Sequence, residues 1–321
     1  MDTRHVVIGI DIGGTTTAIG FVDREGVVLA KATLPTQGFE PAEALVLRVC
    51  DAVFQLQQDL PQGFRLQGIG IGVPNANHAK GTVENPVNLP GWSGSSDLTG
   101  LVRRHFELPV AVTNDANAAA VGELLFGGAR GLRDFIVITL GTGLGSGIVV
   151  NGELVYGADG SAGELGHTVV DPDGRQCGCG KLGCLETYAS ASGICRTVGA
   201  LLAERRDPSP LREVSAAALS SKQVSEAALA GDRIALAAFD RTGRILGMKL
   251  ADAVAHTSPS AIFLFGGLAN AGELILAPTR RYLEHFLFHA YRGTVQVLPS
   301  SIDQGSAAVL GAAALIWNEL D

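Results

Sequence analysis

Two stretches of the chain repeat one pattern of apolar and glycine-rich sequence. Val6 to Val22 is an apolar run, a Gly-Thr-rich turn and a second apolar run, followed by a hairpin turn at 23–26. Ile136 to Val150 repeats this pattern and ends in Asn151-Gly152, and Asn-Gly between apolar runs is a strong hairpin signal. The repetition predicts a duplicated domain with a ligand bound between the halves.

The rest of the chain alternates between helical and strand patterns. Apolar residues at helical spacing predict helices, and short apolar runs bounded by turn residues predict strands. The predicted helices are 41–60, 116–126, 188–205, 215–219, 224–230, 234–255 and 306–320. The further predicted strands are 66–73, 110–113 and 261–265. Strands that alternate with helices predict an α/β fold with mixed sheets.

Composition narrows the class of protein. Of the 321 residues, 46% are apolar and 17% are charged, which is typical of a globular chain long enough for two domains. The net charge is −8 without a basic run, so we expect no nucleic-acid partner. No apolar run approaches the roughly 18–20 residues of a membrane helix. Met1 to Arg4 lead straight into a strand without a signal peptide, so we expect a cytoplasmic protein with no membrane association.

The segment from Glu164 to Glu186 carries a candidate metal site. It holds three cysteines close together, and a histidine lies ten residues before the first. Three thiolates and one imidazole suit a closed structural zinc site, and the intervening glycines let the backbone fold around one ion. The candidate ligands are His167, Cys177, Cys179 and Cys184. Free thiols are the alternative, and this is our interpretation of the isolated Cys50 and Cys195.

Both glycine-rich turns have the composition of phosphate sites. The first reads Asp-Ile-Gly-Gly-Thr-Thr-Thr from Asp11, and the second spans residues 140–147. Glycines let the backbone approach a phosphate, amides and hydroxyls donate to its oxygens, and Asp11 suits Mg²⁺. A plain hairpin is the alternative for either turn alone. Neither turn matches the motif of P-loop nucleotide-binding proteins or of dinucleotide oxidoreductases.

Polar residues also stand at two strand ends. Asp115, between an apolar strand and an Ala-rich helix, is either a helix N-cap or a base that accepts the proton of a sugar hydroxyl. Four asparagines lie in Pro/Gly loops, where they form turns or bind a sugar; they are Asn75, Asn77, Asn85 and Asn88. Trp92 either stacks on a pyranose or covers its loop.

These motifs together resemble the ROK family of repressors, open reading frames and sugar kinases. The turn at Asp11, the Asn114-Asp115 corner, the block from Glu164 to Glu186 and Gly266-Gly267 match the family in order over essentially the whole chain. The resemblance implies the actin-like ATPase (ribonuclease H-like) fold, with two α/β domains around a central cleft. We expect a small domain of residues 1–115 plus 306–321 and a large domain of residues 116–305 that carries the zinc loop.

The resemblance also implies roles for individual residues. Asp115 matches the catalytic base. The residues that match sugar-hydroxyl ligands are Asn114, Glu164, His167 and Glu186, to which we add Asn88 and Asp115 itself. The residues that match the nucleotide site are Gly13, Thr15, Thr16, Thr142, Gly143, Gly266 and Gly267, beside Asp11 and Gly14 of the first turn. His167 would bind the structural zinc through one ring nitrogen and face the sugar with the other.

The implied activity is phosphoryl transfer from ATP, with Mg²⁺, to the 6-hydroxyl of a hexose. The Gly-Val-Pro-Asn segment and the cysteine block look most like the glucokinase branch, so we expect glucose. Kinases for N-acetylmannosamine, N-acetylglucosamine, fructose or allose would use nearly the same residues, and a non-catalytic sugar sensor is a further alternative. A repressor would carry a DNA-binding region ahead of the first strand, which here starts by about Val6. The family usually dimerises, so we expect a homodimer.

Overall fold

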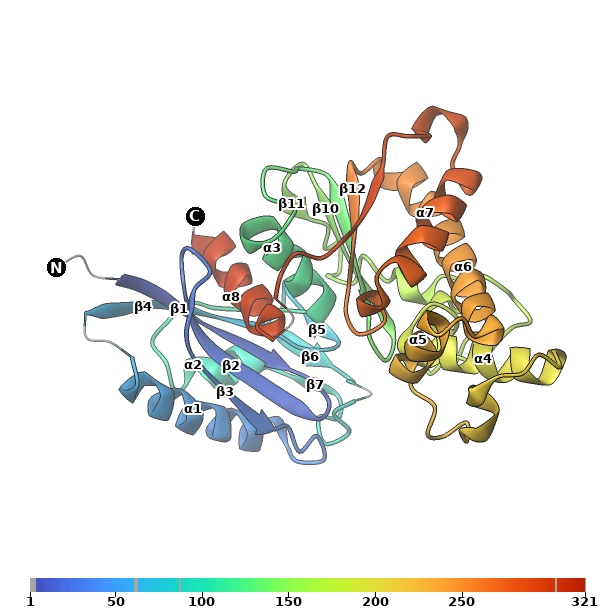
Figure 1. The fold of residues 1–321 in the computed structure, drawn as a ribbon. Helices are drawn as coiled ribbons and strands as arrows, with labels where there is room; N and C mark the ends of the chain where they lie inside the picture. Colours follow the sequence, from blue (N-terminus) through green and yellow to red (C-terminus); the bar gives the residue numbers. More distant parts are fainter. Residues whose placement is uncertain (1–3, 61–62, 87, 304, 321) are drawn as a thin grey trace. The chain divides into compact units, whose positions relative to one another are not determined.

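The computed structural model describes residues 4–60, 63–86, 88–303 and 305–320, which form two compact units (Figure 1). The first unit comprises residues 1–131, 154–162 and 301–321, and the second comprises residues 132–153 and 163–300. The expected path of Met1 to Thr3 into the first strand lies outside the described residues. The predicted boundary at residue 115 coincides with the start of helix α3 (Asp115–Phe126). That helix packs against α8 (Ala307–Leu320), which places residues 116–131 with the first unit.

The first unit is built on a five-stranded mixed sheet in the order β3-β2-β1-β4-β8. The strands are β1 (Arg4–Ile12), β2 (Thr16–Asp23), β3 (Val28–Pro35), β4 (Phe64–Gly72) and β8 (Val110–Thr113). β1 is antiparallel to β2 and parallel to β4, and β8 is parallel to β4. A small antiparallel sheet of β5 (Ala76–Asn77), β6 (Thr82–Glu84) and β7 (Ser95–Ser96) follows β4.

Helices complete the first unit. They are α1 (Ala42–Gln58), α2 (Leu98–Arg103), α3 and α8. α8 contacts both β1 and β4 at unusually short range. A Cβ on Gly9 would lie 2.2 Å from the carbonyl oxygen of Val309, and one on Gly70 would lie 1.8 Å from that of Ala312. Because only glycine fits at these two strand positions, the helix lies directly on the sheet backbone.

The second unit repeats this sheet. Its order is β11-β10-β9-β12-β13, from β9 (Phe135–Leu140), β10 (Leu144–Val150), β11 (Glu153–Leu154), β12 (Ala261–Phe265) and β13 (Gln296–Pro299). β9 is antiparallel to β10 and parallel to β12, and β13 is parallel to β12. The pairing of β9 with its neighbours therefore matches that of β1, which confirms the predicted repeat at the level of topology. The α/β class with mixed sheets is also confirmed.

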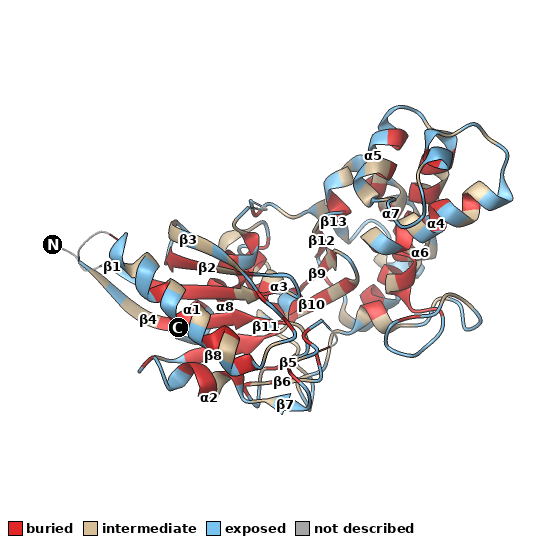
Figure 2. Cartoon of the chain, turned by 90° about the horizontal axis from the view of Figure 1, so that it is seen from below, coloured by how far each residue is buried: buried red, intermediate tan, exposed pale blue. Residues whose placement is uncertain are grey.

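Four α-helices belong to the second unit. They are α4 (Ala191–Glu204), α5 (Ser221–Leu229), α6 (Arg233–Thr257) and α7 (Glu273–Phe286). Figure 2 shows buried residues on the strands and on one side of the helices in each unit, and each unit has its own apolar core. No helix in the described part of the chain combines the length and apolar character that a bilayer crossing requires.

Two differences from the predicted elements have simple causes. The predicted helix at 215–219 is a turn, because five residues are too few to offset helix nucleation without a longer amphipathic face. Helix α7 was not predicted, and it contains Pro278, a residue that normally signals the end of a helix. The other predicted helices and strands are present, with ends that differ by up to three residues.

Candidate active site

The first glycine turn joins β1 to β2 and presents polar groups to solvent. The amide of Gly13 donates to the carbonyl oxygen of Thr16 at 3.0 Å, which closes the turn tightly. Gly14, Thr15 and Thr16 are exposed. This turn therefore offers two hydroxyl side chains beside a glycine backbone, the chemistry that suits phosphate oxygens.

Two acidic residues lie next to this turn. Asp11 pairs with Gly72 of β4, where a Cβ would lie 3.3 Å from Oδ1 of Asp11 and 4.0 Å from Cα of Asp115. Burial raises the pKa of Asp11 to about 7, and the neighbouring charge of Asp115 adds to the increase. A buried carboxylate with a raised pKa is stabilised in its ionised form by a nearby cation. Mg²⁺ prefers one or two carboxylates together with phosphate oxygens as ligands. The residues present therefore fit a magnesium ion.

Asp115 begins helix α3, but its neighbour Asn114 caps that helix. Oδ1 of Asn114 accepts a hydrogen bond from the amide of Asn117 at 2.6 Å, whereas Oδ1 of Asp115 accepts one from the amide of Ala116 at 2.9 Å. The N-cap interpretation of Asp115 is therefore wrong. Its side chain is exposed, although the surrounding protein raises the pKa of the carboxyl by desolvation and the Ala116 amide opposes that increase. The helix thus places an accessible carboxylate near Asp11, at the end of β1 where the first turn begins.

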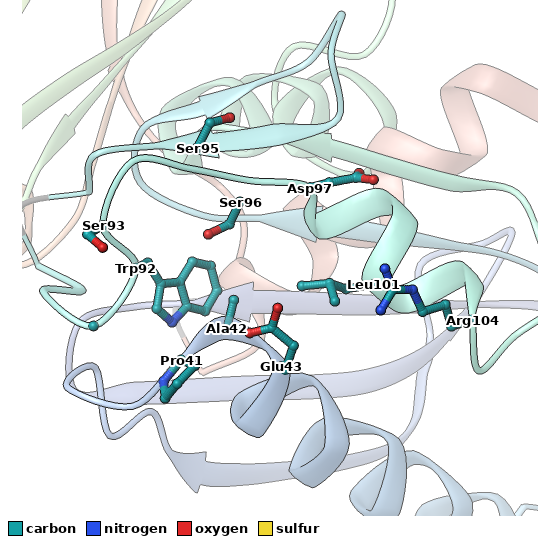
Figure 3. A pocket seen from close by; sticks show the side chains of 11 residues that line it. Pro41, Ala42, Glu43, Trp92, Ser93, Ser95, Ser96, Asp97, Leu101 and Arg104 are labelled. Carbon is teal, nitrogen blue, oxygen red and sulfur yellow. The ribbon is translucent and has the colours of Figure 1, made fainter.

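The predicted sugar residue Asn88 packs against the same turn. A Cβ on Gly14 would lie 3.0 Å from Cβ of Asn88, and Asn88 is exposed. Trp92, four residues later, is only 2% exposed and is one of the residues that line a pocket of about 330 Å³, with Pro41, Ser93 and Arg104 (Figure 3). Because its ring has almost no exposed face, Trp92 covers the loop and the sugar-stacking alternative is not supported.

The remaining asparagines of these loops have structural contacts. Asn75 and Asn85 adopt left-handed backbone conformations with φ of 59° and 45°, which is typical of turn residues. Nδ2 of the buried Asn77 donates to the carbonyl oxygen of Asp159 at 2.7 Å. These three residues therefore shape loops of the first unit.

In the second unit, the four predicted zinc ligands come together. Their ligand atoms all lie within 4.8 Å of one another; the residues are His167, Cys177, Cys179 and Cys184. Sγ of Cys179 is 3.6 Å from Sγ of Cys184, and Sγ of Cys177 is 3.7 Å from Nδ1 of His167. Tetrahedral zinc with bonds of about 2.0–2.3 Å separates its ligand atoms by about 3.6–3.8 Å. The donor set therefore fits zinc, and the thiols do not form disulfides.

Two carboxylates predicted to bind a sugar, Glu164 and Glu186, lie beside His167 of this cluster. His167 directs Nδ1 toward the cysteines and toward Oε1 of Glu186 at 3.7 Å, while its Nε2 is 4.0 Å from Oε2 of Glu164. The Sγ of Cys177 donates to Oε1 of Glu186 at 2.9 Å. Glu164 and Glu186 thus lie at the two ring nitrogens of His167, with Nε2 on the side away from the cysteines.

The second glycine turn joins β9 to β10 and touches this group. Thr142 is exposed, and its carbonyl oxygen accepts a hydrogen bond from Oγ of Ser192 near the start of α4. A Cβ on Gly143 would lie 2.6 Å from Oε2 of Glu186. The structure therefore brings a predicted phosphate residue and a predicted sugar residue into direct contact.

Gly266 and Gly267 follow β12 beside the same turn. Gly266 has a φ of 100°, and a Cβ there would lie 2.9 Å from the carbonyl oxygen of Leu140, the last residue of β9. A side chain is therefore excluded by both backbone conformation and space. At Gly267 the corresponding position meets no atom within 4 Å, so this glycine borders open space.

The sequence did not reveal the residues that hold these loops. Buried Ser146 of β10 donates to the carbonyl oxygen of Gly163 and accepts from the amide of Leu165 at 3.3 Å, next to Glu164. Arg175 donates to the carbonyl oxygens of Thr187 and Gly193 at 2.7 and 3.0 Å. Burial lowers the pKa of Arg175. In the sequence, Arg175 stands out only as a single arginine before the cysteines. Its hydrogen-bond partners come 12 and 18 residues later, so the sequence does not identify them.

Comparison with known proteins identifies the family. The model of the ROK family matches residues 7–319. The chain is similar to the glucokinase of Streptomyces coelicolor (37% identity, 97% of each chain) and to that of Thermotoga maritima (33% identity, 97% of this chain and 96% of the relative). It is also similar to the crystal structure of a ROK family glucokinase from Streptomyces griseus in complex with glucose and AMPPNP (38% identity, TM-score 0.80, 97% of this chain and 98% of the other). With the fold and both glycine turns in place, the chain belongs to the ROK family.

Proposed function

We infer that this protein is an ATP-dependent glucokinase, which transfers the γ-phosphoryl group of ATP to the 6-hydroxyl of glucose. The observation that carries this inference is the likeness, over nearly the whole chain, to a ROK glucokinase that binds glucose and AMPPNP. The accessible carboxylate of Asp115 beside the first glycine turn supports it from within this chain.

We assign Asp115 as the general base of the reaction. Its carboxylate accepts the proton of the 6-hydroxyl as the oxygen of that hydroxyl bonds to the γ-phosphorus and the bond to the β-phosphate oxygen breaks. Its Oδ1 already accepts a hydrogen bond from the Ala116 amide, which orients the carboxylate. Positioning dominates phosphoryl transfer, because the transition state is loose and needs little covalent chemistry from the protein.

The other site residues bind the two substrates. Hydroxyls of the sugar are assigned to Asn88, Asn114, Glu164, His167 and Glu186. Phosphates and adenosine of ATP are assigned to Gly13, Gly14, Thr15, Thr16, Thr142, Gly143, Gly266 and Gly267. Asn114 accepts the Asn117 amide through Oδ1, so its Nδ2 is the atom that we assign to a sugar oxygen.

Two metal ions belong to this proposal. Asp11 would hold Mg²⁺, which neutralises phosphate charge when it is bound. His167, Cys177, Cys179 and Cys184 would hold structural zinc, with all four positions occupied by protein. Zinc on Nδ1 would fix the imidazole ring and so aim Nε2 at the sugar. We also propose that the protein is cytoplasmic and forms a homodimer. Light scattering of the purified protein measures its mass in solution and so tests the dimer.

The test is turnover of the purified, zinc-loaded protein with Mg·ATP, followed as ADP release and as sugar phosphate formed. The sugars are glucose, mannose, fructose, allose, N-acetylglucosamine and N-acetylmannosamine, with ADP release in the absence of sugar as the blank. The highest kcat/KM for glucose supports the proposal. A higher value for another sugar replaces the substrate, and glucose binding without turnover would identify a sugar sensor.

A further inference from the structure

Thr36 is a buried polar residue to which the proposed reaction assigns no role. It follows β3, is 1% exposed and contacts the first glycine turn at three points. Its Oγ1 donates to the carbonyl oxygen of Gly13 at 2.7 Å, and its amide donates to the carbonyl oxygen of Thr15 at 2.9 Å. Oγ1 also lies 2.9 Å from Oγ1 of Thr17. One residue just after β3 therefore holds both ends of the phosphate turn.

The direction of these hydrogen bonds follows from the donors present. A carbonyl oxygen has no proton, so the single hydroxyl proton of Thr36 goes to Gly13. The hydroxyl of Thr17 must then donate to Oγ1 of Thr36. The result is a chain of donors from Thr17 through Thr36 to Gly13. A valine at position 36 would keep the shape of the side chain but remove both bonds.

The loop after Thr36 also contacts the loop of Asn88, which we assign to the sugar. Nη2 of Arg48 donates to the carbonyl oxygen of Thr36 at 2.8 Å, and the amide of Gly91 donates to that of Gly38 at 2.8 Å. A Cβ on Gly38 would lie 3.0 Å from the carbonyl oxygen of Asn88. Thr36 thus faces the phosphate turn, and Gly38, two residues later, faces the Asn88 loop.

We propose that Thr36 is a positioning residue for the phosphate donor: its hydroxyl fixes the backbone of the Gly13–Thr16 turn in the conformation that binds the phosphates of ATP. This proposal rests on the proposed function, because KM for Mg·ATP can be measured only if the protein is a glucokinase. Binding of the nucleotide can be measured without turnover, so the two can fail separately.

The experiment compares Thr36→Val with Thr36→Ser in the full chain. Titration calorimetry measures the dissociation constant of Mg·AMPPNP, and steady-state kinetics measure KM for Mg·ATP and for glucose. We expect Thr36→Val to weaken Mg·AMPPNP binding and raise KM for Mg·ATP about tenfold, since two buried hydrogen bonds at the turn are lost. Thr36→Ser keeps the hydroxyl and should stay within about threefold of the wild type, and KM for glucose should change less than about twofold in both variants.

Two further variants separate positioning from a general loss of structure. Thr17→Val removes an equally buried hydroxyl but leaves the Thr36–Gly13 bond, so Mg·AMPPNP binding should weaken far less than in Thr36→Val. Gly38→Ala disturbs the same loop on the Asn88 side and should raise KM for glucose more than KM for Mg·ATP.

Three results would overturn the proposal. The first is a loss of Mg·AMPPNP affinity in Thr36→Ser as large as in Thr36→Val. The second is an equal loss of that affinity in Thr17→Val. The third is that Thr36→Val and Gly38→Ala each change KM for Mg·ATP and KM for glucose by the same factor. A wild-type protein that does not bind Mg·AMPPNP would instead contradict the proposed function, and this inference with it.

Discussion

Gly143 and Glu186 pack so closely that a methyl group on the glycine would lie 2.6 Å from Oε2 of the glutamate. Gly143 belongs to the turn that we assign to phosphate, and Glu186 to the sugar ligands. Glu186 also contacts the zinc cluster through Cys177 at 2.9 Å. Under these assignments, a side chain at Gly143 should displace Glu186 by direct contact.

Gly143→Ala should weaken glucose binding. The added methyl displaces the end of a flexible side chain, so the fold tolerates it while the Glu186 carboxylate moves away from its position. We expect KM for glucose to rise about tenfold, the equivalent of about 1.4 kcal/mol, with a melting temperature close to that of the wild type. Gly141→Ala is the matched control, because its methyl meets no atom within 4 Å. Equal effects of the two variants on KM for glucose would contradict the predicted contact.

Asp115→Asn should abolish most of the turnover and spare glucose binding. The amide keeps the size of the side chain but cannot accept the hydroxyl proton, so kcat should fall about 10²–10⁴-fold. Glucose affinity, measured by calorimetry, should change less than about threefold, since one of several hydrogen bonds is altered and not removed. Substantial turnover by Asp115→Asn would show that another group takes the proton.

Asp11 should make the Mg²⁺-free protein less stable as the pH rises. The pKa of its carboxyl is about 7 in the folded protein against an ordinary value of 3.8, so between these values the folded state binds more protons than the unfolded state. The free energy of unfolding therefore falls from about pH 4 to pH 7, and the loss from this half-buried group should be on the order of 2 kcal/mol.

Urea unfolding at pH 5 and pH 7.5 measures this effect, with Asp11→Asn as the comparison. The variant cannot ionise at this position and should lose less stability than the wild type over the same interval. An identical decrease in both proteins would show that other groups cause it.

Removal of zinc should impair sugar binding. The four ligands and their neighbour Glu186 share one loop, which loses its cross-link when the ion is removed. We expect about one zinc per chain, and a 10–100-fold lower kcat/KM for glucose after chelation or in Cys184→Ser. Cys195→Ser, on α4 and outside the cluster, should retain both zinc and activity. A fully active protein without bound zinc would refute the structural role.

Sequence patterns were sufficient where the signal is local. Short apolar runs and Asn-Gly or Gly-rich turns predicted the β1–β2 and β9–β10 hairpins, since turn chemistry and strand propensity act over a few residues. The spacing of the three cysteines likewise predicted a shared site. Helix α7 was not predicted because it contains Pro278, and the sequence does not show the packing that stabilises a helix with an internal proline.

The sequence by itself determined the family, the repeated sheet and the set of polar residues at the strand ends. Only the tertiary structure decided which of them act together: Asn114 caps α3 and leaves Asp115 accessible, Glu186 fills the space above Gly143, and Thr36 supports Gly13 from 23 residues away. The physical reason is range. Propensity and periodicity operate between neighbours in the chain, whereas hydrogen bonds and close contacts between distant segments depend on how whole elements pack.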